Sequence, residues 1–289
     1  PVVPRTGPQR TTRAIMPAMT LNPHDVRRAA ERISGHVRRT PLLPLPDRGP
    51  GALAPHLWAK PENLQTTGSF KLRGAMNFLA AMDERERGRG VVTHSSGNHG
   101  QAVACAAATF DVPATVVIPE GAPEVKVERT RAWGATVLRC ENSGVAREAA
   151  AQAVASETGA TLVPPYDHAW IVAGQGTVGL EIAADLPEVA NVLVCVGGGG
   201  LSAGTVLALR DTAPHARVIG VEPALAADAQ ASLRAGRRVA WTPERTNRTI
   251  ADGVRTQQLG EVPWGVLKHG LHGIVTVPEE AIRAAAAWW

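Results

Sequence analysis

Short apolar runs alternate with alanine-rich segments along most of the chain, and the two patterns predict strands and helices in turn. The apolar runs are rich in Val, Ile and Thr, as expected for buried strands, and they span residues 91–95, 115–119, 136–140, 161–165, 192–197, 217–222 and 274–278. The intervening segments contain good helix formers, among them 101–109, 143–157, 176–185 and 202–210. This strand–helix rhythm predicts an α/β fold with mostly parallel, twisted sheets flanked by helices.

The first part of the chain has a different pattern. Residues 1–18 mix Pro, Arg and Thr without a helical or strand period, and we expect a disordered lead-in that lacks the apolar stretch of a secretory signal. A helix is predicted over 22–33, with Asn22 or Asp25 at its start. Its buried face is predicted to consist of Val26, Ala29, Ala30 and Ile33.

Composition and charge narrow the class of protein. A chain of 289 residues exceeds one average domain, which predicts two lobes or one large α/β unit. No apolar run approaches the roughly 18 residues of a membrane span, so we expect no membrane insertion. Residues 1–40 hold eight arginines against Asp25 and Glu31, which gives this segment a net charge of +6, whereas the whole chain has +4. The remaining −2 argues against a nucleic-acid surface.

Cysteine and lysine are both scarce. The three cysteines are far apart and form no CxxC pair, which indicates neither a disulfide framework nor a structural zinc site and favours a reducing cytoplasm; they are Cys105, Cys140 and Cys195. Chemistry that needs an amine has four candidates, which are Lys60, Lys71, Lys126 and Lys268.

A strand, a run of four glycines and a helix start follow one another at VLVCVGGGGLSAGTVLAL, residues 192–209. Glycines allow backbone N–H groups to close around an anion, and the following helix adds the positive end of its dipole. The sequence therefore predicts a phosphate site at Gly197–Gly200. Gly198, Gly200 and Ala203 also satisfy the spacing of a dinucleotide-binding turn, and Glu222 follows about twenty residues on. A NAD-dependent dehydrogenase is thus an alternative from spacing alone.

Two further segments carry candidate chemistry. In KPENLQTTGSFKLRGA, residues 60–75, Lys71 stands at a predicted helix entry between Phe70 and Leu72. Apolar neighbours that desolvate an amine lower its pKa and favour the free amine that forms a Schiff base. In VVTHSSGNHGQAVA, residues 91–104, hydroxyls and an amide follow a strand and precede a helix. Such a helix start suits a carboxylate or another planar polar ligand.

Five motifs in order resemble the threonine dehydratase and serine racemase family of pyridoxal phosphate (PLP) enzymes, the fold-type II or tryptophan synthase β-like group. They are TGSFKLRGA (67–75), SSGNHGQ (95–101), AGQGTVGLEI (173–182), VGGGGLSAG (196–204) and TIADG (249–253), and the resemblance runs from about residue 22 to 282. It implies a two-lobed α/β enzyme and favours PLP over NAD.

The resemblance also implies roles for individual residues. Lys71 would hold PLP as a Schiff base and then act as the proton-transfer base, and Ser96 matches the second acid/base of racemases. The cofactor would be bound by Phe70 at the ring, Asn98 at the phenolic oxygen, Gly197, Gly198, Gly199, Gly200 and Leu201 at the phosphate, and Gly253 beyond the ring. The substrate carboxylate would be bound by Ser95, Ser96, Asn98 and His99.

Two more sites are implied. In part of the family the turn equivalent to VEPALAADA, residues 221–229, binds a divalent cation, here through Glu222, Asp228 and the carbonyl oxygen of Ala226. Such hard oxygen ligands suit Mg²⁺ or Ca²⁺. For Arg147, in the predicted helix 143–157, two interpretations stay open: an ordinary solvated helix arginine, or a bidentate partner for a second substrate carboxylate, as a hydroxyaspartate would offer.

We therefore expect an ammonia-lyase that converts L-threonine or L-serine into a 2-oxo acid and ammonia. A serine racemase and a hydroxyaspartate dehydratase of the same fold are the alternatives. The expected large lobe comprises 19–89 and 168–289, and the small lobe 90–167. A homodimer is expected from the family. After AIRAAAAWW we find no segment like the one that contacts the pyridine nitrogen in the family, so we expect either a truncated chain or a diverged C-terminus.

Overall fold

The computed structural model describes residues 21–45, 57–95 and 97–288, and the expected lead-in at 1–18 lies outside them. One parallel sheet has the strand order β5-β4-β3-β6 and a second has the order β7-β8-β9, while β1 and β2 form a short antiparallel pair. The strands are β1 (Leu43–Pro44), β2 (Trp58–Ala59), β3 (Val91–His94), β4 (Ala114–Pro119), β5 (Thr136–Cys140), β6 (Thr161–Leu162), β7 (Asn191–Cys195), β8 (Arg217–Pro223) and β9 (Gly273–Val277).

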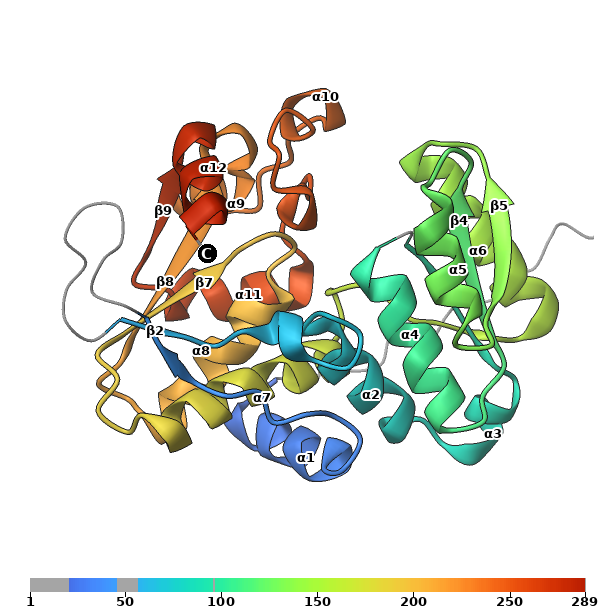
Figure 1. The fold of residues 1–289 in the computed structure, drawn as a ribbon, viewed down its shortest axis with the longest axis horizontal. Coiled ribbons are helices and arrows are strands. Elements are labelled where there is room, and N and C mark those ends of the chain that lie inside the picture. The colour runs from blue at the N-terminus through green and yellow to red at the C-terminus, as the bar shows by residue number, and fades with distance from the viewer. Residues whose placement is uncertain (1–20, 46–56, 96, 289) are drawn as a thin grey trace, which may run out of the picture.

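Helices flank both parallel sheets, which confirms the predicted fold class. The α-helices are α1 (Pro23–Ile33), α2 (Lys71–Ala81), α3 (Glu84–Gly88), α4 (Asn98–Thr109), α5 (Glu124–Arg131), α6 (Gly144–Thr158), α7 (Ala169–Asp185), α8 (Gly200–Thr212), α9 (Asp228–Ala235), α10 (Pro243–Thr246), α11 (Glu261–Gly270) and α12 (Glu279–Trp288). Short 3-10 turns are η1 (Glu62–Leu64), η2 (Ala224–Ala226) and η3 (Asp252–Val254). Figure 1 shows the two sheets in separate halves of the molecule, with α2 between them.

All seven predicted strands are present, and the largest differences in extent are at β6 and α7. The strand expected over 161–165 ends at Leu162, because Pro164 and Pro165 have no N–H to donate to a ladder. The helix expected over 176–185 begins earlier, at Ala169. Glycines occur inside this helix because other backbone lies so close that a side chain would not fit. A Cβ at Gly174, for example, would lie 2.5 Å from the Arg73 carbonyl oxygen.

The helix predicted over 22–33 is α1, and its start is explained by a capping box. The side chain of Asn22 accepts from the His24 N–H, and the Asp25 carboxylate accepts from the Asn22 N–H at 2.9 Å. Of the face predicted to be buried, Val26, Ala29 and Ile33 are buried and Ala30 is half-buried.

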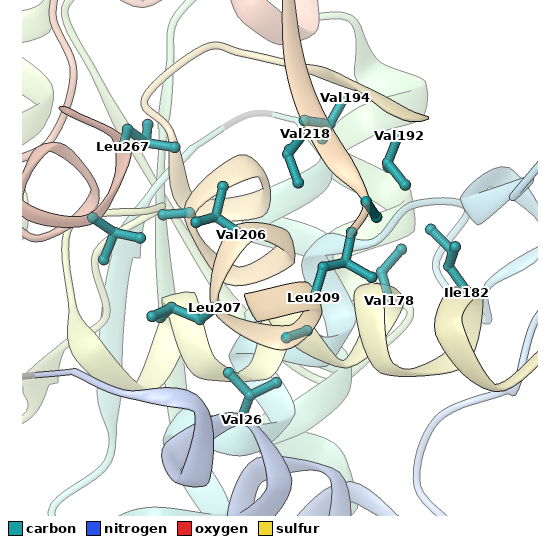
Figure 2. Close-up of a cluster of buried hydrophobic side chains, with 14 of the residues drawn as sticks. Val26, Val178, Ile182, Val192, Val194, Val206, Leu207, Leu209, Val218 and Leu267 are labelled. Atoms are coloured by element: carbon teal, nitrogen blue, oxygen red, sulfur yellow. The ribbon is translucent and has the colours of Figure 1, made fainter. Parts of the chain in front are cut away.

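The core of one half surrounds α8. Figure 2 shows α8 side chains packed among residues of β7, β8, α7 and α1, namely Val206, Leu207 and Leu209 with Val192, Val194, Val218, Val178, Ile182 and Val26. A second buried cluster joins α2 to α4. These clusters fix the helices that begin next to the sheets' carboxyl ends, where ligands bind in folds of this kind. Among the described residues, none of the helices combines the length and hydrophobicity that spanning a bilayer requires.

Candidate active site

Lys71 is the first residue of α2 and lies in contact with the segment that follows β6. Its Nζ donates to the carbonyl oxygen of Pro165 at 2.8 Å and lies 5.3 Å from the centre of the Phe70 ring. Neither contact supplies a negative charge. Burial therefore lowers the pKa of Lys71 to about 8, as the apolar neighbours Phe70 and Leu72 led us to expect.

The other three lysines have different environments. Lys60 Nζ forms an ion pair with Glu181 at 2.6 Å, Lys126 lies 3.9 Å from Asp252, and Lys268 is exposed. Lys71 thus differs from these three in being removed from solvent without a carboxylate beside it among the described residues, which lowers its pKa to about 8. A group with a pKa of about 8 is roughly one-tenth unprotonated at pH 7, so a free amine is available there.

The glycine turn has close neighbours that require glycine. Gly199 has φ +91° and precedes the start of α8, so it adopts a conformation that a side chain would strain. A Cβ at Gly198 would lie 2.3 Å from the ring of Tyr166, and one at Gly199 would lie 2.8 Å from Pro263. The turn thus places backbone N–H groups at the N-terminus of a 13-residue helix, the arrangement that binds phosphate.

The segment after β6 joins the lysine to the glycine turn. Val163 accepts from the ring of His99, Pro165 accepts from Lys71, and the ring of Tyr166 packs on Gly198. Asp167 then accepts from the backbone N–H of Val262 at 2.8 Å. Sequence reasoning missed Pro165 and Tyr166. The rule that ligands bind in the loops after parallel strands could have identified this segment.

The N-terminus of α4 forms another side of the site. Ser95 lies directly after β3, where its Oγ accepts from the Gly97 N–H at 3.2 Å, and Asn98 is exposed at the start of α4. Ser96 lies outside the described residues. The first N–H groups of α4 have no partner one turn earlier in the helix, so they are suited to binding a carboxylate.

The ring of His99 is fixed by a backbone carbonyl oxygen and does not offer a positive charge to a substrate carboxylate. Its Nε2 lies 3.1 Å from the carbonyl oxygen of Val163 and must donate, because a carbonyl only accepts. Nδ1 is then an acceptor, and it is buried without a partner among the described residues. Burial, followed by the charge of Lys71, lowers the pKa of His99 to about 3. The neutral ring cannot attract a carboxylate by charge, whereas its backbone N–H faces the same helix start.

The TIADG segment approaches the glycine turn from the other side. A Cβ at Gly197 would lie 3.1 Å from Val254 and 3.5 Å from Oγ1 of Thr256, which is buried without a partner among the described residues. A Cβ at Gly253 would meet no protein atom within 4 Å. Gly253 is exposed, so any steric requirement for glycine at this position must come from a bound group. Leu201 packs against the core around α8.

Two buried carboxyls occupy the predicted metal turn. Glu222 accepts from the backbone N–H groups of Ala229 at 3.0 Å and Gln230 at 2.8 Å, and Oδ2 of Asp228 has no partner among the described residues. Burial raises the pKa of Glu222 to about 8 and that of Asp228 to about 7. Ala226 is fully buried beside them. No group of three or more His, Cys, Asp or Glu side chains suited to a metal occurs in the described ranges, so the metal site stays a prediction.

Arg147 lies in the first turn of α6, at the edge where β3 and β5 end. Its Nε donates to the carbonyl oxygen of Ser143 at 3.3 Å. Its charge contributes, after burial, to the lowered pKa of His94, the last residue of β3. The guanidinium therefore lies near the strand end that leads into Ser95.

Comparison with known proteins identifies the class. A family model described as pyridoxal-phosphate dependent enzyme matches residues 33–289. An L-threo-3-hydroxyaspartate ammonia-lyase of Saccharomyces cerevisiae is 40% identical over 89% of this chain and 78% of its own length. A Schizosaccharomyces pombe serine racemase is 40% identical over 89% and 79%, and a Geobacter sulfurreducens L-threonine ammonia-lyase is 42% identical over 90% and 64%.

Solved structures agree with the sequence relatives. Maize serine racemase superposes with a TM-score of 0.86 at 36% identity, covering 93% of this chain and 80% of the other. The serine racemase of Dictyostelium discoideum gives a TM-score of 0.83 at 35% identity, covering 92% and 84%. This chain belongs to the pyridoxal-phosphate dependent enzymes, and it has their fold-type II architecture.

The residues of this chain fit the cofactor of its family. Lys71 supplies an amine that is partly unprotonated near neutral pH, and the glycine turn supplies a phosphate cradle whose Cβ positions are blocked by Tyr166 and Pro263. The dehydrogenase alternative needs Glu222 free to bind its cofactor, whereas the Glu222 carboxylate is turned toward the N–H groups of α9.

Proposed function

We propose that this protein is a PLP-dependent ammonia-lyase that converts L-threonine or L-serine into a 2-oxo acid and ammonia by α,β-elimination. The observation that carries the proposal is the amine of Lys71, which is desolvated, has no carboxylate partner within the ranges that the structure describes, and lies in contact with the segment that packs on the glycine turn. The names of the Geobacter threonine ammonia-lyase and the yeast hydroxyaspartate ammonia-lyase support elimination as the reaction type.

When bound, PLP supplies a ring that delocalises the electron pair left behind when the substrate loses its Cα proton. We assign Phe70, Asn98, Gly253 and the glycine turn with Leu201 to holding the cofactor. Lys71 would accept the Cα proton once the substrate amine has replaced it, because an amine with a pKa of about 8 is a suitable base near neutral pH.

We assign the substrate carboxylate to the N-terminus of α4. Ser95, Ser96 and the backbone N–H groups of Asn98 and His99 would bind it, because a helix N-terminus offers both free donors and the positive end of the dipole. The neutral His99 ring, fixed by its bond to Val163, would exclude water behind the carboxylate.

The test is an absorbance spectrum of the purified holoprotein, followed by addition of L-serine or L-threonine while 2-oxo acid is measured. Lys71→Ala should remove the band of the lysine-bound cofactor and the activity together. An intact band in this variant contradicts the assignment of Lys71. Serine recovered as a mixture of D and L forms, with little 2-oxo acid, would show a racemase instead.

A second candidate substrate is 3-hydroxyaspartate. It is favoured by Arg147, whose guanidinium lies near the end of β3, where a second substrate carboxylate would come within reach. An arginine fork binds a carboxylate in a bidentate pair. Arg147→Leu should raise KM for 3-hydroxyaspartate far more than KM for L-serine, and an equal change in both would contradict a role for Arg147 in distinguishing them.

We also propose a divalent cation, Mg²⁺ or Ca²⁺, at Glu222, Asp228 and the Ala226 carbonyl oxygen. Two carboxyls that are each 1% exposed are costly to ionise without a nearby cation, which supports this assignment.

The remaining proposals concern organisation. We propose a large lobe of 19–89 and 168–289 and a small lobe of 90–167, in accord with the sheet of β7–β9 and the sheet of β3–β6. A homodimer in a cytoplasmic location is proposed as well. The free state of Cys105, Cys140 and Cys195 supports a reducing compartment.

A further inference from the structure

Four charged side chains are buried together behind the helix that carries Lys71. Arg73 is fully buried, and its Nε and Nη2 each lie 2.8 Å from one carboxylate oxygen of Glu62. Its Nη1 and Nη2 also donate to the two oxygens of Glu181 at 2.6 and 3.0 Å. Lys60 completes the group with a contact of 2.6 Å to Glu181. We call these four residues the ion cluster.

Neutral groups complete the hydrogen bonding of the cluster. Thr40 donates from Oγ1 to Glu62 at 2.6 Å and accepts from Lys60 at its carbonyl oxygen, also at 2.6 Å. Oγ1 of Thr177 lies 3.2 Å from Nη1 of Arg73. The two positive and two negative charges balance, and they tie α2 to η1, to the residue after β2 and to α7.

The ion cluster and Lys71 lie on opposite sides of α2. Residues two apart on an α-helix point about 200° from each other. Arg73 therefore holds the helix from the side of α7, while Lys71 faces Pro165 and the glycine turn. The helices are also in close contact at this level, since a Cβ at Gly74 would lie 2.4 Å from the Gln175 side chain.

Stability alone is a weak explanation for such a cluster. Apolar residues of similar volume often stabilise a protein as well as a buried ion group does, because burial of charges carries a large desolvation cost. Two bidentate pairs differ from apolar packing in being directional, so they restrict both rotation and sliding of the helix. The first turn of α2, where precision matters for Lys71, is the turn that they restrain.

We propose that the ion cluster of Arg73, Glu62, Glu181 and Lys60 is a positioning device that fixes the rotation and height of α2, so that the Lys71 amine is held against the Pro165 carbonyl in the site. Arg73 is thus a positioning residue that acts through Lys71. The inference rests on the role proposed above for Lys71. Displacement of a reacting group by about 1 Å can reduce a rate by about 100-fold.

The test uses cofactor-free protein, so that its result does not depend on turnover. A small amine-acylating reagent is applied over a range of pH, and the labelling of Lys71 is measured by mass spectrometry, with the exposed Lys268 as internal reference. In the unaltered protein the labelling midpoint should lie at about 8. Arg73→Lys, which keeps the charge but loses the bidentate geometry, should move the midpoint up by about one unit or more as the amine becomes hydrated.

The matched control is Leu79→Ala in the same helix. Leu79 is fully buried in the core between α2 and α4 and lies six residues beyond Arg73 in the helix, so the variant should lose stability while all four side chains of the ion cluster remain. It should lower the melting temperature and leave the labelling midpoint of Lys71 unchanged. Equal midpoints in Arg73→Lys and the unaltered protein, or equal shifts in Arg73→Lys and Leu79→Ala, would overturn the proposal.

A milder variant covers the case in which Arg73→Lys does not fold. Thr177→Val removes one neutral hydrogen bond from Arg73 at nearly constant volume, and it should raise the midpoint by a few tenths of a unit. No shift in this variant would overturn the proposal. Failure of the proposed function is seen separately, because it leaves the Lys71→Ala holoprotein with an unchanged absorbance band, whereas the labelling experiment reports only where the amine lies.

Discussion

Lys60 and Lys71 are both enclosed by the protein, yet their surroundings give them opposite properties. Lys60 has a side chain that is 6% exposed and is neutralised by the carboxylate of Glu181. In the described part of the chain, the amine of Lys71 forms no ion pair; it donates to a carbonyl oxygen and lies near the ring of Phe70. We propose that burial without a counter-charge is what sets Lys71 apart, because the protonated form is then the costly one.

The largest expected effects come from exchanging each lysine for methionine. Lys71→Met should lower turnover by about 1,000-fold or more, because the attachment and the base are lost together. Its unfolding free energy should change by less than about 1 kcal/mol, because an apolar side chain replaces an uncompensated amine. Turnover measured per bound cofactor and denaturant titration check both values.

Lys60→Met should give the reverse result. Glu181 would lose one of its two cations while remaining buried, so the unfolding free energy should fall by about 3 kcal/mol. The folded fraction should still attach its cofactor to Lys71. Attachment of the cofactor at residue 60 in the unaltered protein, found by reductive trapping and peptide mapping, would reverse the comparison.

The sequence predicted the desolvated lysine better than it predicted the surroundings that desolvate it. Phe70 and Leu72 flank Lys71 in the chain, so its desolvation was visible locally. Its partner Pro165 is 94 residues away, and the ring that packs on the glycine turn belongs to Tyr166. Strand periodicity says where a strand ends, whereas it does not say which backbone carbonyl a distant side chain will reach.

The two carboxylates that bind Arg73 were likewise only partly predictable from the sequence. Glu62 is in the same motif as Lys71, but Glu181 is in a helix whose role was inferred only from resemblance. Both carboxylates meet at Arg73 because α2 and α7 cross at small residues, where a Cβ on Gly174 would lie 2.5 Å from the Arg73 carbonyl oxygen. Such a crossing depends on tertiary packing, which no local pattern reports.

A substitution in the glycine turn should disturb Lys71 through its partner segment. A Cβ in Gly198→Ala would lie 2.3 Å from the ring of Tyr166, so the ring and the adjoining Pro165 carbonyl must shift. Cofactor affinity should fall by about 100-fold, because both the phosphate cradle and the contact of Lys71 change. Fluorescence titration of the cofactor measures this.

Gly265→Ala is the control for this substitution. A Cβ at Gly265 meets no atom within 4 Å, and the residue lies inside α11. This variant should bind the cofactor normally and gain a little stability, since alanine favours a helix interior. Similar affinities for Gly198→Ala and Gly265→Ala would show that the turn tolerates a side chain and that Tyr166 does not confine it.

Glu222 and Asp228 present the opposite case to Lys71, since they are two buried carboxyls that form no ion pair with any described side chain. A divalent ion that binds there should raise the melting temperature by about 3 to 6 °C at a hundredfold excess over its Kd. Asp228→Asn should remove most of this shift, because it removes one of two charged ligands. Thermal melts with Mg²⁺, with Ca²⁺ and with a chelator measure it, and equal shifts in both proteins would indicate non-specific binding.

The smallest effect is expected at Lys126, which has a carboxylate partner but little burial. Its Nζ lies 3.9 Å from Asp252, and the side chains are 39% and 67% exposed, so water screens the pair. Lys126→Ala should change the unfolding free energy by less than about 1 kcal/mol and turnover by less than about threefold, with both differences vanishing at high salt. Urea titrations and turnover at two salt concentrations measure this. A loss of tenfold or more would mean that pairing without burial also controls the site, through a contact between α5 and the TIADG segment, and burial would then not be what separates the lysines.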